Sequence, residues 1–257
     1  MPATDAQRSV AATDREPQPL PIVPPETSII VTIDGPAGTG KSTVAHALAT
    51  ALGVDVLDTG AMYRAAAAIA IDNELSLDEP EKIVETLVDA DLHFDWSQDP
   101  PAILAWMRPL NERIRKPDVT ALVSKIAAIK ELREHLVRKQ RIIAAQHPRL
   151  VSEGRDQGSV VFPDADVKFY LDADPRVRAE RRAEQLAEAG QSVTIDEVHK
   201  RILERDHLDS TRTDGPLVCP DDAITIDTTR LAFDEVVERL RREVVARIPQ
   251  LHRRHGS

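Results

Sequence analysis

A glycine-rich segment carries the spacing of a phosphate-binding loop. Its pattern is G-x-x-x-x-G-K-[ST], made by Gly35, Pro36, Ala37, Gly38, Thr39, Gly40, Lys41, Ser42 and Thr43. In such a loop the glycines let backbone N–H groups surround a polyphosphate. Lys41 would reach the β- and γ-phosphates, and the Ser42 hydroxyl would bind Mg²⁺. The segment therefore predicts binding of a nucleoside triphosphate with Mg²⁺ as its cofactor.

The residues on either side of this loop are those that it needs. Residues 29–34 form a β-branched apolar run that predicts a buried parallel strand, and residues 42–52, rich in Ala and Leu, predict a helix. Strand, loop and helix in this order are the structural context of the motif. A glycine-rich turn without function is the alternative, and the lysine and the flanking elements argue against it.

Further along the chain, short apolar segments alternate with helical patterns. The other predicted strands are 54–58, 150–153, 167–171 and 223–226, and the predicted helices are 119–145, 175–189, 195–207 and 233–248. This alternation is typical of an α/β fold with a doubly wound, five-stranded parallel sheet. Ligands of such sheets bind at the carboxyl ends of the strands, where Asp34, Asp58 and Arg155 are expected.

One region interrupts the alternation. Residues 92–96 and 102–107 predict two short strands joined by a turn, and we interpret about 72–117 as a small insert against the ligand edge of the sheet. The main domain would then span 28–248. A Pro-rich leader at 1–27, expected to be disordered, precedes it, and a flexible basic tail at 249–257 follows it.

The composition limits the classes of function. The formal net charge is −10, so we expect no nucleic-acid surface, and a phosphate site must gather Arg and Lys locally. No apolar run approaches the length of a membrane span. The single cysteine, Cys219, excludes a disulfide framework and suits a reducing compartment, so we expect a cytoplasmic protein.

Several arginines follow strands or helices that open onto the ligand edge. They are Arg64, Arg155, Arg205 and Arg212. Phosphoryl transfer between two anions needs such groups, because charge on the donor, the acceptor and the transferred group must be neutralised together. Any one of them alone could be a surface group or a structural ion-pair partner. The chain lacks the N-K-x-D motif that reads guanine, which argues against a GTPase and favours a kinase.

Four sequence blocks resemble, in order, those of the bacterial-type cytidylate (CMP/dCMP) kinases. The blocks are T-I-D-G-P-A-G-T-G-K-S-T at 32–43, L-D-T-G-A-M-Y-R at 57–64, E-G-R-D-Q-G-S-V-V-F-P-D-A at 153–165, and E-R-D with D-S-T-R and P-L within 204–217. The resemblance runs from about residue 29 to 245. It implies the P-loop NTPase-type fold of the nucleoside-monophosphate kinases, with the monophosphate-binding insert at about 72–117 and a short lid at about 175–206.

The resemblance also implies an activity and its participants. The γ-phosphoryl group of ATP would be transferred to CMP or dCMP, which gives ADP and CDP or dCDP. The partners would be these small molecules alone, and we expect a monomer. Two alternatives stay open: another small P-loop kinase, for UMP or a non-nucleotide acceptor, and an ATP-binding regulator without catalysis.

Roles follow from the resemblance residue by residue. On the monophosphate side lie Thr59, Tyr63 and Arg64, and Asp209 matches a group that contacts the acceptor ribose. The positions that read cytosine are Ser124, Arg133 and Asp156. The phosphate-binding and catalytic set is Lys41, Arg64, Arg155, Arg205 and Arg212. On the lid helix, Arg178, Arg181 and Arg182 either contact ATP or are solvated.

The cytosine assignment makes chemical sense. Cytosine has an amino donor at N4 beside acceptors at N3 and O2, and a carboxylate with a guanidinium or hydroxyl group complements that edge. At the strand ends, Asp34 and Asp58 either hold water bound to Mg²⁺ or cap backbone N–H groups. Glu153 stands where several relatives carry Asp, and its longer side chain changes the reach of that carboxylate.

Overall fold

The computed structural model describes residues 23–188 and 190–248. The basic tail and most of the Pro-rich leader lie outside these residues. The end of the leader, residues 23–27, packs on the domain, in contrast to the expected disorder. Val23 is fully buried in the core around the central strand, and its N–H donates to the Leu52 carbonyl at 3.2 Å. An apolar side chain with a place in the core therefore extends the domain to at least Val23.

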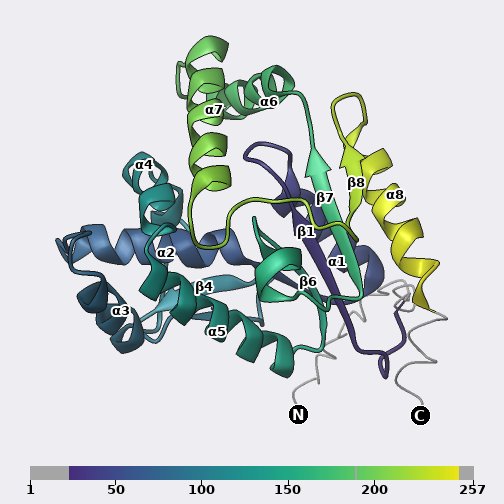
Figure 1. Cartoon of the computed structure of the whole chain (residues 1–257), viewed down its shortest axis with the longest axis horizontal. Coiled ribbons are helices and arrows are strands. Elements are labelled where there is room, and N and C mark those ends of the chain that lie inside the picture. The colour runs from purple at the N-terminus through teal and green to yellow at the C-terminus, as the bar shows by residue number, and fades with distance from the viewer. Residues whose placement is uncertain (1–22, 189, 249–257) are drawn as a thin grey trace, which may run out of the picture.

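A five-stranded parallel sheet forms the centre of the molecule, as the alternating pattern predicts. In spatial order its strands are β2 (Asp55–Asp58), β6 (Arg149–Glu153), β1 (Ile29–Asp34), β7 (Val167–Asp172) and β8 (Ile224–Asp227). The three central strands are largely buried on both faces, whereas the edge strands β2 and β8 are partly exposed. The carboxyl ends of all five strands share one edge, toward which β7 points in Figure 1.

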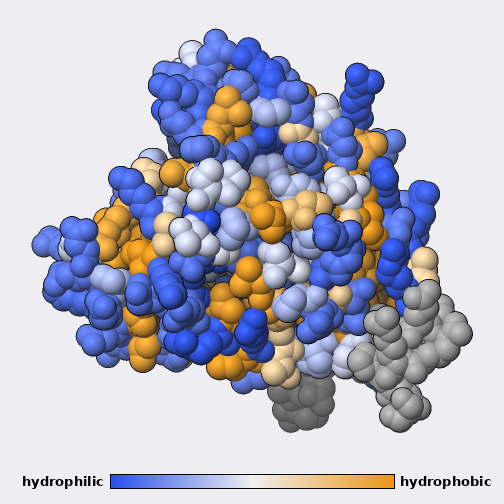
Figure 2. Space-filling view, viewed as in Figure 1, coloured by the Kyte–Doolittle hydropathy of each residue, from blue (hydrophilic) through white to orange (hydrophobic). Residues whose placement is uncertain are grey.

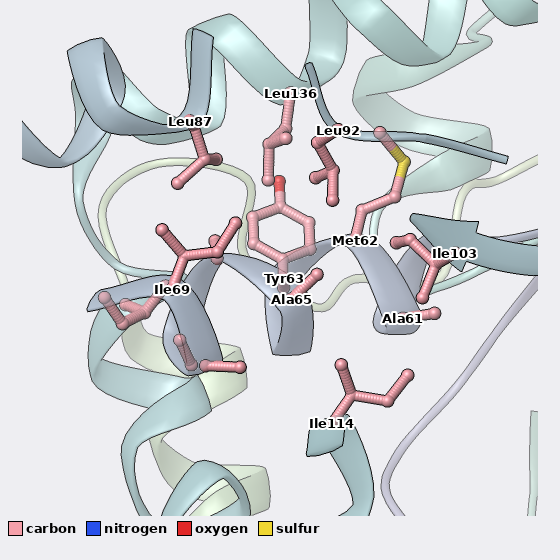
Figure 3. Packing of buried hydrophobic residues seen from close by; sticks show 14 of the residues in the cluster. Ala61, Met62, Tyr63, Ala65, Ile69, Leu87, Leu92, Ile103, Ile114 and Leu136 are labelled. Atoms are coloured by element: carbon pink, nitrogen blue, oxygen red, sulfur yellow. The ribbon is translucent and has the colours of Figure 1, made fainter. Parts of the chain in front are cut away.

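Helices cover both faces of this sheet. On one face, α1 (Lys41–Leu52) and α8 (Phe233–Val245) share a core with β1 and β7. On the other face, α2 (Thr59–Asp72) is the centre of a second core, in which four consecutive alanines, residues 65–68, are fully buried. Figure 3 shows the Tyr63 ring of α2 close to Leu92 and Leu136. The start of α2, which follows β2 directly, is thus fixed at the carboxyl edge.

The structure has two helices where the pattern over 119–145 predicts one. Helix α4 (Pro117–Ile126) ends before α5 (Lys130–Gln146) begins. The prediction of one helix was wrong because the sequence does not mark the break. The three residues between the helices, 127–129, include neither Gly nor Pro, and apolar residues continue across them. The carbonyl of Ala127 accepts a hydrogen bond from Arg133 Nη1 at 3.2 Å, so a side chain from the first turn of α5 stabilises the break.

Two helices project from the carboxyl edge of the sheet. They are α6 (Pro175–Glu188) and α7 (Ile195–Thr211), and α7 continues past the predicted end at residue 207. The two helices pack together through a small apolar cluster of Ala179, Ala183, Val198 and Ile202. Their outer surface is mostly hydrophilic (Figure 2). A narrow apolar seam, together with ion pairs of Arg176 with Asp196 and of Arg178 with Asp206, therefore holds this projecting pair together.

A small antiparallel sheet follows α3 (Pro80–Asp89). It comprises β3 (His93–Asp95), β4 (Ala102–Ala105) and β5 (Arg108–Pro109), and a 3₁₀ turn (Arg113–Arg115) follows it. The two predicted strands are present, and the exposed two-residue β5 was not predicted. Beyond β3, the Trp96 ring stacks on His147 with centroids 4.0 Å apart. His147 Nδ1 is 2.8 Å from Asp55 Oδ2, so this contact ties the small sheet to the edge of the main one.

None of the helices in the described ranges is long and apolar enough to cross a membrane.

Candidate active site

A cavity of about 960 Å³ opens at the carboxyl edge of the main sheet. That volume lies in the range of small-molecule sites. Sixteen of the residues predicted from the sequence line it: Ala37, Gly38, Thr39, Gly40, Lys41, Ser42, Thr43, Thr59, Tyr63, Arg64, Ser124, Arg155, Asp156, Arg205, Asp209 and Arg212. The predicted residues that do not line it are Gly35, Pro36 and Arg133.

The phosphate-binding loop joins β1 to α1 at this edge. Gly35 has a φ of +147°, and a Cβ on it would lie 2.0 Å from the carbonyl oxygen of Leu171, so only glycine allows this approach to β7. Lys41 is buried, and its Nζ donates to the Pro36 carbonyl at 2.7 Å and to Thr39 Oγ1 at 3.3 Å. Burial, aided by the nearby Arg155, lowers the pKa of Lys41 to about 7. A bound anion would favour the charged form of this lysine.

The loop is also held from outside, by an ion pair between α6 and α7. Arg178 Nη1 lies 2.6 Å from Asp206 Oδ2 and donates to the Ala37 carbonyl at 2.8 Å. The Ala37 N–H in turn donates to Asp206 Oδ1 at 3.1 Å. Arg178 therefore supports the loop and does not line the cavity. This role was not assigned from the sequence, because no local pattern connects residues so far apart.

Two further arginines of α6, Arg181 and Arg182, do line the cavity. Arg181 Nη2 donates to the Thr228 carbonyl at 2.7 Å, and Arg182 Nη1 donates to Gln185 Oε1 at 3.2 Å. Of the three lid arginines considered from the sequence, these are the two placed to meet a ligand directly.

Carboxylates gather beside the loop at the ends of β2 and β6. Ser42 Oγ donates to Glu153 Oε1 at 2.7 Å. Burial, with the neighbouring Glu153 second, raises the pKa of Asp58. Hydroxyl and carboxylate oxygens are the ligands that Mg²⁺ prefers, so this donor set fits that ion. No cluster of three or more His, Cys, Asp or Glu suited to a metal occurs among the described residues, so the ion would depend on the phosphates of ATP as well as on this donor set.

Asp34 has a capping role in the structure. Its carboxylate accepts the N–H groups of Gln157 at 2.9 Å and Gly158 at 2.7 Å, which fixes the turn after β6. Burial raises the pKa of Asp34 to about 6, although these two N–H groups oppose the shift. Asp58 also caps, because its Oδ1 accepts the Ala61 N–H at 2.8 Å at the start of α2.

Arginines surround the middle of the cavity. Arg155 Nε donates to Asp209 Oδ2 at 2.8 Å. Burial by itself would lower the pKa of Arg155, but the Asp209 carboxylate outweighs burial, and the pKa is raised. Arg205 Nε is buried and has no hydrogen-bond partner among the described residues; it lies 4.0 Å from Asp209 Oδ2. Burial, with Arg155 second, lowers the pKa of Arg205 to about 10. Two buried positive charges side by side, with one N–H donor that lacks a hydrogen bond, favour the binding of an anionic ligand between them.

Arg64, at the α2 side, is held by α4 and the turn before it. Its Nη1 donates to Thr120 Oγ1 at 3.0 Å and to the Ile114 carbonyl at 3.4 Å. Burial lowers the pKa of this arginine. Thr120 also lines the cavity and was not predicted. Its spacing of four residues from Ser124 on α4 puts both on one helix face, a signal that the sequence does carry.

The deep end of the cavity holds a buried ion pair. Arg133 Nη2 bonds Asp156 Oδ2, and both side chains are almost fully buried. The Arg133 Cζ lies 5.5 Å from the centroid of the Tyr63 ring. Asp156 lines the cavity and Arg133 stands behind it. Burial raises the pKa of Asp156, and the guanidinium groups of Arg133 and then Arg212 oppose that effect.

Of the two strand-end carboxylates expected near Mg²⁺, Asp58 lines the cavity and Asp34 does not. Other lining residues had no role assigned from the sequence, among them Gly60, Arg115, Lys125, Arg201, Thr228, Leu231 and Phe233. Most lie on loops or exposed helix faces, where the local sequence resembles any solvated surface.

Comparison with known proteins gives a consistent result. A family model described as cytidylate kinase matches residues 31–246. A protein of Carboxydothermus hydrogenoformans named cytidylate kinase is 44% identical over 210 residues, which are 82% of this chain and 94% of that protein. Proteins with the same name from Caldanaerobacter subterraneus subsp. tengcongensis (45% over 213 residues; 83% and 93% coverage) and Corynebacterium efficiens (43% over 218 residues; 84% and 94%) are similar to the same extent.

Proposed function

Because the chain belongs to the cytidylate kinase family, we propose that its cavity binds ATP and CMP side by side. The chain is an ATP-dependent kinase of CMP or dCMP, and the reaction gives ADP and CDP or dCDP. One observation supports the proposed site above all. Lys41, Ser42 and four arginines come from segments far apart in the sequence, and all of them line one cavity.

A panel of acceptors tests this function. Release of ADP is measured in a coupled assay with CMP, dCMP, UMP, AMP and GMP. We expect kcat/KM to be highest for CMP and dCMP. A higher value for UMP would support another pyrimidine kinase, and no ADP release with any acceptor would support a regulator without catalysis.

Binding and placement do most of the chemical work. The acceptor oxygen of CMP is already an anion at neutral pH, so no strong general base is needed. The rate enhancement would come from in-line placement and from charge neutralisation by Lys41 and the arginines. Residues 72–117 and 175–206, as insert and lid, would close over the substrates and exclude water that would otherwise hydrolyse ATP.

We assign the Mg²⁺ of the ATP complex to Ser42, with Asp58 and Glu153 beside it. Bound there, the ion would offset negative charge on the phosphates. The Ser42 hydroxyl, which bonds Glu153 at 2.7 Å, would turn an oxygen lone pair toward the metal, and the carboxylates would hold its water ligands.

Glu153→Gln tests the metal assignment. Loss of one carboxylate charge should raise the Mg²⁺ concentration for half-maximal activity by about tenfold. The measurement is a magnesium titration at saturating ATP and CMP, and Glu238→Gln, which alters an exposed ion pair on α8, is the control. An unchanged titration midpoint would remove Glu153 from the metal site.

Arg64→Ala and Arg212→Ala test the acceptor phosphate site. Each should lower kcat/KM for CMP by about 100-fold, because a charge-assisted contact to the phosphate is lost, while the KM for ATP stays nearly constant. Steady-state kinetics with each substrate varied in turn would measure this. The control is Arg242→Ala, whose side chain is 74% exposed on α8. Variants that lose stability but keep specific activity would instead show purely structural arginines.

A further inference from the structure

The loop that follows α7 lies directly on the ion pair between Arg133 and Asp156. Gly215 in this loop has a φ of +57°, and a Cβ on it would lie 2.1 Å from Arg133 Nη2 and 2.4 Å from Asp156 Oδ2. Real Cβ atoms essentially never approach other atoms within 3.0 Å. Any residue other than glycine must therefore displace the loop or the pair.

The loop is anchored on both sides of Gly215. Arg212 Nε donates to the Gly215 carbonyl at 2.6 Å. The Leu217 N–H donates to the Asp209 carbonyl at 2.8 Å, and the Leu217 side chain is buried. Movement of the loop would break these contacts, so an added side chain would act mainly on the ion pair.

The pair is enclosed on its other sides. Arg133 Nη1 donates to the Ala127 carbonyl at 3.2 Å, and the Tyr63 ring lies next to the guanidinium group. Arg133 and Asp156 are only 4% and 2% exposed. A side chain added at Gly215 could therefore displace the Asp156 carboxylate only toward the cavity, which Asp156 lines.

We propose that Gly215 determines base specificity. Its missing side chain lets the loop lie against the pair and fixes the orientation in which the Asp156 carboxylate faces the acceptor base. This inference rests on the proposed reading of cytosine by Asp156. Gly215 acts through Arg133 and Asp156 and is therefore a positioning residue. The same loop carries Arg212, so one short segment links the base pocket to the acceptor phosphate site.

The expected chemical effect is selective. A carboxylate in the right orientation accepts a hydrogen bond from cytosine N4, whereas uracil presents the O4 acceptor there. Displacement of the carboxylate removes a favourable contact for CMP and an unfavourable one for UMP. The ratio of kcat/KM for CMP to that for UMP should therefore fall, and ATP binding should change little.

The test compares Gly215→Ala with Gly190→Ala. Gly190 has a φ of +75° but nothing within 4 Å of a Cβ, so its variant has a similar backbone strain without the collision. Gly215→Ala should lower kcat/KM for CMP by about tenfold or more and reduce the CMP-to-UMP ratio, with the KM for ATP within about twofold. Gly190→Ala should leave the CMP-to-UMP ratio as in the wild type.

A double-mutant cycle tests whether the effect passes through Arg133. Lysine at this position lacks the Nη2 atom, which is the nearer of the two atoms that the added methyl group would meet, and the pair then has room to shift away from Gly215. In an Arg133→Lys background, Gly215→Ala should therefore change the CMP-to-UMP ratio much less than in the wild type. Additive effects would contradict the proposed route.

A second variant covers the case in which Gly215→Ala does not fold. Pro216→Ala keeps Gly215 but frees the backbone of the loop, and it should reduce the same ratio in the same direction. An unchanged ratio in folded Gly215→Ala, or in Pro216→Ala if the former does not fold, would overturn this inference alone. A wild-type enzyme that neither binds nor phosphorylates CMP would overturn the proposed function as well.

Discussion

Lys41→Met is expected to lower kcat by about 10³-fold while the fold persists. We propose that this lysine reaches the transferred phosphoryl group, and methionine approximately preserves the length of its apolar stem. Its native contacts are hydrogen bonds to Pro36 and Thr39 within one loop, so the free energy of unfolding should change by less than about 2 kcal/mol. The measurements are kcat in the ADP-release assay and the midpoint of thermal unfolding.

The control for Lys41→Met is Lys200→Met, which removes a cation that is 80% exposed on α7. This variant should keep wild-type turnover. If Lys41→Met itself turned over within about tenfold of the wild type, the loop would not be the site of phosphoryl transfer.

Asp156→Asn is expected to cut turnover of CMP sharply and to reduce the preference for CMP over UMP by about 100-fold. In the proposed site the wild-type carboxylate, which is a hydrogen-bond acceptor, would face the O4 acceptor of uracil, and a buried mismatch of this kind costs a few kcal/mol. The asparagine amide can present either its N–H donor or its oxygen acceptor to the base, so it no longer discriminates between cytosine and uracil. The measurement is kcat/KM for both acceptors, with the KM for ATP expected to stay constant.

Asp156 also neutralises the buried Arg133, so its replacement should reduce stability as well. Asp222→Asn is the control, because Asp222, although 66% exposed, pairs with the buried Lys168 at 2.8 Å and does not line the cavity. It removes the charge facing another buried cation without touching the base pocket. If Asp156→Asn keeps the wild-type CMP-to-UMP ratio, base selection lies with Ser124, Arg133 or the insert.

Much of the fold and of the site could be predicted because the informative residues stand at the ends of parallel strands. Lys41 follows β1, Arg64 follows β2, and Arg155 and Asp156 follow β6. In a parallel sheet these ends share one edge, so topology alone brings the residues together. Apolar runs bounded by polar residues gave the strand positions, and the phosphate-binding spacing identified the loop.

The parts that were not predicted depend on particular side-chain contacts that no local sequence pattern marks. No local sequence feature marks the break between α4 and α5, where the Ala127 carbonyl meets Arg133. Likewise, nothing around Arg178 indicates that it holds the Ala37 peptide. The close approach of Gly215 to the buried pair is visible only once α5, β6 and the loop after α7 are assembled.

The contact between Trp96 and His147 has a spectroscopic consequence. The chain has two tryptophans, Trp96 and Trp106, and both lie in or next to the small sheet. The main sheet, α6 and α7 contain none, so intrinsic tryptophan emission is a built-in reporter of the small sheet alone. Because the imidazole stacks on one indole, any motion that separates the small sheet from the end of α5 should change that indole's emission. Movement of this part on addition of CMP can therefore be followed in the unlabelled wild-type protein.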